Sequence, residues 1–195
     1  MRILLVGAPG SGKGTQSAGL AQHFNVPSVS SGELLRELAA VDNESGRQIA
    51  SYLSRGDLVP DDLIIAAVRD ALAKAVSSGG YVLEGFPRTV AQARRGEPFL
   101  VPDAVIHLVV PDEVARARVA GRAGAGRTDD AEQAVIERRL RHFHDEIGPI
   151  LQHYRDRGVL TTVDADRPPD AVHDAILHAL ANKGQESENG NVRHQ

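Results

Sequence analysis

The chain has 195 residues, a formal net charge of −4 and no cysteine. This length allows one packed domain with a small insertion, and the lack of cysteine excludes disulfides and thiolate-bound metals. The negative charge argues against a protein that binds nucleic acid through phosphate contacts. No apolar run is long enough to span a membrane, and the first residues do not resemble a signal peptide. We therefore expect a cytoplasmic protein without nucleic-acid or membrane partners.

Short apolar runs alternate with segments of helical spacing along the chain. The apolar runs expected to form strands are residues 2–6, 26–30, 81–84, 104–110 and 159–163. The segments expected to form helices are residues 13–24, 31–38, 45–54, 61–76, 112–120 and 169–181, and a long helix with Ile136, Leu140, Phe143 and Ile147 on one face. Strands that alternate with helices indicate an α/β fold with a parallel five-stranded sheet flanked by helices.

Residues 1–182 are expected to form a single domain, followed by a tail at 183–195. The tail is polar and lacks periodicity, which predicts disorder. Pro149 lies within the pattern of the long helix and is expected to kink or interrupt it. In sheets of this class, ligands bind beyond the carboxyl ends of the strands. The informative loops are those that follow Val6, Ser30, Glu84, Val110 and Val163.

The first of these loops is rich in glycine. Residues 7–13 read GAPGSGK and match the pattern G-x-x-x-x-G-K between a strand and a helix. Backbone N–H groups of such a loop turn toward a phosphate, the helix adds the positive end of its dipole, and Lys13 supplies a cation. Gly14 stands where the usual motif has a hydroxyl that binds Mg²⁺. Magnesium is therefore expected to rest mainly on nucleotide phosphates and water, with carboxylates acting indirectly.

Motifs in the other loops complete a resemblance to a known family. The stretches that carry it are, in chain order, GAPGSGKGTQ at 7–16, SSGELLR at 30–36, GDLVPD at 56–61, EGFPRTVAQA at 84–93, an arginine-bearing segment at 121–131 and VDADRP at 163–168. In this order and spacing they resemble the adenylate kinase family of nucleoside-monophosphate kinases, over nearly the whole chain.

The resemblance implies a P-loop NTPase-like sheet with two additions. One is a helical insertion at 30–59 that binds the nucleoside monophosphate, and the other is a short lid at 121–131 without structural zinc. The implied activity is reversible transfer of phosphate from ATP, bound with Mg²⁺, to AMP, which gives two ADP. The resemblance also suggests a monomer whose partners are these nucleotides alone.

The resemblance assigns roles to individual residues. The residues implied in ATP binding are Gly10, Ser11, Gly12, Lys13, Gly14, Thr15, Arg122 and Arg167. Those implied in AMP binding are Ser31, Arg36, Asp57, Leu58, Val59, Gly85, Phe86, Pro87, Arg88, Gln92, Arg127 and Arg139. The cations implied in catalysis are Lys13, Arg88, Arg122, Arg127 and either Arg138 or Arg139. No general base is required, because the acceptor oxygen of AMP is already anionic.

The choice between Arg138 and Arg139 depends on the direction of counting. The second arginine of the lid segment is located by the spacing usual in the family. Counted forward from Asp130, this spacing selects Arg138, and counted back from Leu140, it selects Arg139. Adjacent side chains on a helix point about 100° apart, so only one of the two can face the site. The apolar face of the long helix favours Arg139.

Two acidic positions depart from the pattern of the family, and two polar positions bear on the acceptor. Glu33 and Glu84 stand where aspartates are typical, and Glu84 is expected to act on Mg²⁺ through water. An extra methylene moves a carboxylate by about 1.5 Å, enough to motivate an alternative, a nucleotide-binding paralogue with weak transfer activity. A kinase that prefers UMP or CMP is a second alternative, against which Ser31 and Gln92 favour AMP.

Overall fold

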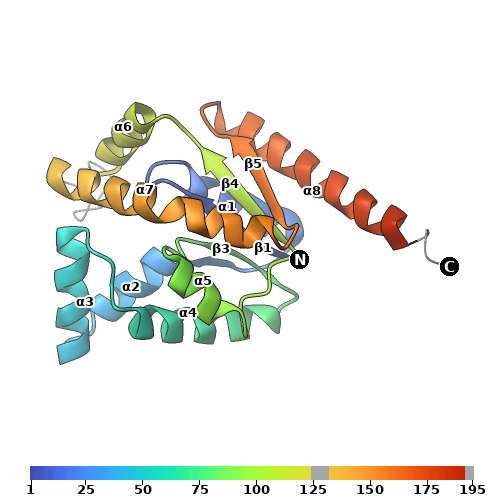
Figure 1. The fold of residues 1–195 in the computed structure, drawn as a ribbon. Helices are drawn as coiled ribbons and strands as arrows, with labels where there is room; N and C mark the ends of the chain where they lie inside the picture. The colour runs from blue at the N-terminus through green and yellow to red at the C-terminus, as the bar shows by residue number, and fades with distance from the viewer. Residues whose placement is uncertain (124–131, 192–195) are drawn as a thin grey trace.

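The computed structural model describes residues 1–123 and 132–191, with the side chains of 1–121 and 132–182. A five-stranded sheet lies at its centre, and each strand is parallel to its neighbours in the order β2-β3-β1-β4-β5 (Figure 1). The strands are β1 (Arg2–Gly7), β2 (Ser28–Ser30), β3 (Tyr81–Glu84), β4 (Ala104–Val109) and β5 (Leu160–Asp164). The predicted α/β fold with a parallel five-stranded sheet is confirmed.

Helices connect the strands and cover both faces of the sheet (Figure 1). Those of the described ranges are α1 (Lys13–Phe24), α2 (Ser31–Ala39), α3 (Glu44–Arg55), α4 (Asp61–Val76), α5 (Val90–Gly96), α6 (Asp112–Ala123), α7 (Gln133–Arg155) and α8 (Pro169–Asn191). The short helix α5 was not predicted, because its small and charged side chains show no apolar period. The sequence feature that marks its start is the N-cap residue Thr89, whose Oγ1 accepts a hydrogen bond from the Gln92 backbone N–H at 3.1 Å.

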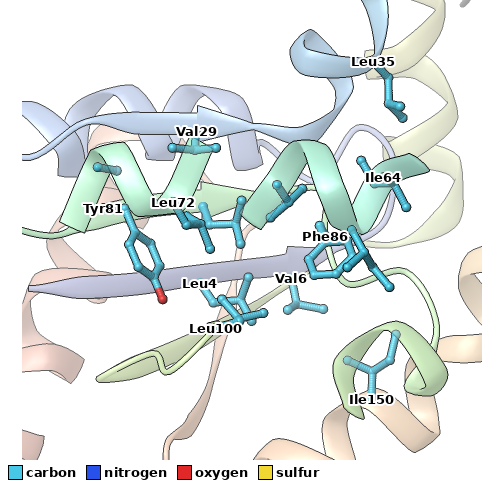
Figure 2. Close-up of a cluster of buried hydrophobic side chains, with 14 of the residues drawn as sticks. Leu4, Val6, Val29, Leu35, Ile64, Leu72, Tyr81, Phe86, Leu100 and Ile150 are labelled. Atoms are coloured by element: carbon cyan, nitrogen blue, oxygen red, sulfur yellow. The ribbon is translucent and has the colours of Figure 1, made fainter. Parts of the chain in front are cut away.

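Residues 3–6 of the central strand β1 are all apolar and buried, because the two faces of the strand pack against different helices. Leu4 belongs to a cluster that includes Ile150 of α7 and side chains of α4 (Figure 2). Leu5 points to the other face, where it packs in a cluster with Leu20 of α1 and Ile176 of α8. Because helices bury both faces of the sheet, the loops at the carboxyl ends of the strands remain accessible for binding.

The interruption expected as one outcome at Pro149 and the expected end of the last helix need correction. Pro149 does not interrupt α7, which continues to Arg155. Proline has no N–H to donate to the carbonyl of Asp145, four residues earlier. Pro149 and Asp145 are both exposed, so water can bond to this carbonyl instead.

Helix α8 continues to Asn191, well beyond its expected end near residue 181 and into the tail that was expected to be disordered. Once a helix is nucleated and docked, each further residue adds one hydrogen bond at low cost, so polar residues can prolong it. Residues 192–195 lie outside the described part of the chain. In the described ranges, no helix combines the length and the apolar character needed to cross a membrane.

Candidate active site

A cavity of about 170 Å³ opens at the carboxyl ends of β1 and β3. Four parts of the chain line it: the glycine-rich loop before α1, the region from α2 to the loop after α3, the loop after β3, and one face of α7. The predicted site residues on its wall are Gly10, Gly12, Lys13, Gly14, Arg36, Leu58, Glu84, Gly85, Pro87, Arg88 and Arg139. Residues far apart in sequence therefore meet at the edge where ligands of parallel sheets bind.

A smaller pocket of about 20 Å³ adjoins this cavity. The residues that line both are Leu53, Leu58, Gly85 and Arg88. The remaining wall of the small pocket is formed by Ser31, Leu35, Asp57, Val59, Ile64 and Gln92. Ser31 is fully buried, and its Oγ has no hydrogen-bond partner among the described residues. The pocket thus combines apolar walls with a few polar atoms, as sites for small molecules do.

The glycine-rich loop wraps around its own lysine. Nζ of Lys13 donates hydrogen bonds to the carbonyl oxygens of Gly7 and Ala8, each at 2.7 Å. Gly10 has φ of +85°, and a Cβ there would lie 2.3 Å from a carbonyl oxygen of α6, so only glycine fits. Burial lowers the pKa of His107 on β4, and the charge of Lys13 lowers it further. His107 is therefore neutral near pH 7 and adds no second cation beside the lysine.

The loop after β3 brings an acid and a cation to the same cavity. The Glu84 carboxylate accepts a hydrogen bond from Ser30 Oγ at the end of the neighbouring strand β2. Gly85 has φ of +81°, and a Cβ there would lie 2.5 Å from Ser31 Oγ. Nε of Arg88 donates to the Gly85 carbonyl oxygen at 2.8 Å. The backbone of Gly85 thus forms a wall that no larger residue could form.

Among the described residues of the cavity wall, positive charge gathers around one acid. The cationic side chains on its wall are Lys13, Arg36, Arg88 and Arg139, and Glu84 is the acid. The forked guanidinium groups and the compact ammonium are the side chains that bind phosphate best. The arrangement suits a ligand with several phosphate groups, whose charge the four cations would balance.

The two adjacent arginines of α7 have different surroundings. Arg139 is half-buried, lines the cavity and donates from Nη2 to the Leu53 carbonyl oxygen at 3.3 Å. Arg138 is exposed, and its Nη1 donates to Asp57 Oδ1 at 2.9 Å. Asp57 Oδ2 accepts from Arg55 Nε at 2.8 Å, and the bonds from Arg55 and Arg138 lower the pKa of Asp57. On geometry, Arg139 and not Arg138 faces the site.

Some predicted residues line neither pocket. Phe86 is 1% exposed and packs in the core shown in Figure 2. Ser11 is buried, Thr15 is exposed, and the Nη2 of Arg167 donates to the Ala171 carbonyl oxygen at 3.4 Å. The predicted contacts of these residues with nucleotides stay predictions.

The lid at 121–131 lies largely outside the described residues, as do all of Arg127 and the side chain of Arg122. Their assignments, and the expectation of no structural zinc, therefore remain predictions.

Sequence reasoning did not select two residues that the structure brings to the site. His142 lines the cavity with its Nε2 buried 4.0 Å from Asp57 Oδ1, and this nitrogen has no hydrogen-bond partner among the described residues. Its signal was its place three residues after Arg139, on the same helix face. Asp61 accepts a hydrogen bond from Gln92 Nε2 at 2.8 Å. No local pattern indicates that contact, which joins α4 to α5.

Comparison with known proteins agrees with this geometry. The family model described as adenylate kinase matches residues 5–159, which include the glycine-rich loop, the insertion and all of α7. Curated proteins of the same name match along most of their length. The adenylate kinase of Thermobifida fusca is 37% identical over 188 residues, which cover 94% of this chain and 100% of the relative.

Two further relatives extend the comparison to other bacteria. The adenylate kinase of Xanthomonas oryzae pv. oryzae is 40% identical, and that of Mycobacterium tuberculosis is 41% identical; each match covers 92% of this chain and 99% of the relative. These names favour adenylate kinase over the alternative of a UMP- or CMP-preferring kinase. The chain belongs to the adenylate kinase family.

Proposed function

We propose that the protein transfers a phosphoryl group reversibly from ATP, bound with Mg²⁺, to AMP and so forms two ADP. One observation carries the proposal: the phosphate loop follows β1, the loop that borders the small pocket follows the neighbouring strand β3, and both line one cavity. Among the described residues, this cavity is lined by four cations. The names of the relatives supply the adenine nucleotides. A monomer in the cytoplasm is part of the same proposal and follows from the family resemblance.

The reaction needs alignment and charge stabilisation more than covalent help from the protein. An oxygen of the AMP phosphate attacks the γ-phosphorus of ATP, and the bond from that phosphorus to the bridging oxygen of ADP breaks. Arg36 and Arg88 hold the acceptor phosphate through paired N–H groups, which suits the guanidinium fork. Lys13 and Arg139 stabilise charge on the moving group. Lys13 must first leave the carbonyl groups of Gly7 and Ala8.

Magnesium enters with ATP and neutralises part of the phosphate charge. Glu84 suits an indirect role toward it, because this half-buried carboxylate lines the cavity and is held by Ser30. We propose that Glu84 orients water around the metal, since Gly14 offers no hydroxyl for direct contact.

A coupled assay with the purified full chain tests the proposed function. ATP and Mg²⁺ are supplied with AMP, CMP, UMP or GMP in turn, and we expect AMP to give the highest kcat/KM. A higher kcat/KM with CMP or UMP would overturn the acceptor. Binding of ATP without turnover of any acceptor would instead support the paralogue with weak transfer activity.

Two substitutions at Glu84 test its proposed role. Glu84→Gln keeps the shape and an oxygen that accepts from Ser30, but it removes the charge, so we expect the Mg²⁺-dependent rate to fall at least about tenfold. Glu84→Asp keeps the charge and restores the residue typical of the family, so activity should be retained or raised. Initial rates at several Mg²⁺ concentrations measure both effects. Equal rates for the glutamine variant and the parent protein would show that the carboxylate takes no part.

A further inference from the structure

Gln92 is held at both ends of its side-chain amide. The residue is 2% exposed, and its Oε1 accepts a hydrogen bond from the Arg88 backbone N–H at 2.7 Å. Its Nε2 donates to Asp61 Oδ1 at 2.8 Å. A backbone N–H can only donate, and an ionised carboxylate can only accept. These two partners therefore permit one orientation of the amide. A flipped amide would place its NH₂ group against the Arg88 N–H and its oxygen against the Asp61 carboxylate.

The fixed amide leaves two polar positions for a ligand in the small pocket. Gln92 lines that pocket beside Ser31 and Gly85. The second N–H on Nε2 and the second lone pair on Oε1 are not used by Asp61 or Arg88. The edge of adenine presents an acceptor, N1, next to a donor, the 6-amino group. This pattern complements an amide of fixed direction, whereas hypoxanthine and guanine present N1–H and O6, which is the reverse pattern.

Asp61 is itself held in position between α4 and α5. It is the first residue of α4, and its Oδ2 lies 3.8 Å from Arg95 Nη1. Arg95 also donates from Nη2 to Asp62 Oδ1 at 2.5 Å. The carboxylate of Asp61 thus lies between Gln92 and a guanidinium group, and it does not line either pocket. Its direct contact with the site is the hydrogen bond from Gln92.

We propose that Asp61 is a positioning residue for the choice of acceptor base: it fixes the direction of the Gln92 amide and thereby favours adenine over 6-oxopurines. The inference rests on the proposed function, because it takes a purine monophosphate as the acceptor. A residue that acts in this way changes the ratio of kcat/KM between two substrates, whereas general loosening of the pocket lowers kcat/KM for both substrates alike.

The test compares AMP with IMP, since hypoxanthine reverses the hydrogen-bonding edge without adding the 2-amino group of guanine. The quantity measured is the ratio of kcat/KM for AMP to that for IMP. We expect Asp61→Ala to lower this ratio about tenfold, because only the Arg88 backbone N–H then opposes rotation of the Gln92 amide, so the orientation that accepts an oxo group becomes less costly. Asp61→Asn should keep the ratio within about threefold, because its carbonyl oxygen can still accept from Gln92 Nε2.

Asp62→Ala is the matched control. Asp62 also lies in the first turn of α4 and binds Arg95, but among the described residues Gln92 bonds to Asp61 and not to Asp62, whose side chain is 87% exposed. Its removal should leave the ratio unchanged. If Asp61→Ala does not fold, as judged by thermal unfolding, Asp61→Ser serves instead, because its shorter side chain retains a polar group at the helix start but cannot span the contact.

The outcomes separate this inference from the proposed function. A parent protein that does not phosphorylate AMP would overturn both. A parent protein that prefers AMP, with variants at Asp61 that keep the same AMP-to-IMP ratio, would overturn only the positioning role. Equal loss with both substrates would assign Asp61 a merely structural part, and would also overturn the inference.

Discussion

Lys13→Met is expected to lower kcat roughly 10²- to 10³-fold, the range found when one preorganised hydrogen-bond donor to a transition state is removed. The ammonium of Lys13 lies in the phosphate loop at the wall of the cavity. In the proposed reaction, the charge of the transferred group would develop there. Methionine keeps much of the length and apolar stem of the side chain but carries no charge. Initial rates at saturating ATP and AMP measure the effect.

Lys74→Met is the control for this change. Lys74 is exposed on α4 and lines neither pocket, so its removal should leave kcat unaltered. Lys13 also satisfies two backbone carbonyls, so thermal unfolding should accompany the rates to show that the variant is folded. A folded Lys13→Met variant with kcat within threefold of the parent protein would refute the assigned role.

Arg139→Met is expected to lower kcat at least about 10²-fold, whereas Arg138→Met should stay within about threefold. The two residues are neighbours of the same type, so general effects of removing a charge from α7 should be alike. They differ in direction: Arg139 lines the cavity, and Arg138 forms an exposed pair with Asp57. The comparison therefore isolates the direction of the side chain.

A third variant, Arg139→Lys, tests whether the forked geometry matters as well as the charge. Lysine cannot form two parallel hydrogen bonds to one phosphate, so we expect kcat between those of the parent protein and the methionine variant. Equal loss at positions 138 and 139, or a larger loss at 138, would contradict the geometry described for α7.

Local patterns were sufficient to predict the sheet and the phosphate loop. The strands β1, β3 and β4 lie within short apolar runs with clear ends, and the loop at 7–13 is contiguous in sequence. The direction of Arg139 also followed from a local pattern, because Leu140 and Phe143 mark the buried face of the helix.

Contacts between distant segments could not be predicted in the same way. The bond between Asp61 and Gln92 depends on how α4 packs against α5, and α5 itself has no apolar period. Asp57 meets Arg138 across 81 positions of sequence, so nothing near either residue indicates the pair. These contacts are set by tertiary packing, which overrides or adds to local preference.

The parallel pairing of β1 with β3 sets the distance between the two phosphate-binding loops independently of the side chains around the small pocket. Leu5 and Glu84 are partners in the register of these strands, and the donor and acceptor loops begin just beyond them. Neighbouring strands lie about 4.8 Å apart, a spacing set by backbone hydrogen bonds and not by side chains. If the small pocket binds the acceptor base as proposed, substitutions around it can alter which base is accepted while the span between the two phosphate-binding loops stays constant. Substrate range can drift in this scaffold without a redesign of the chemistry.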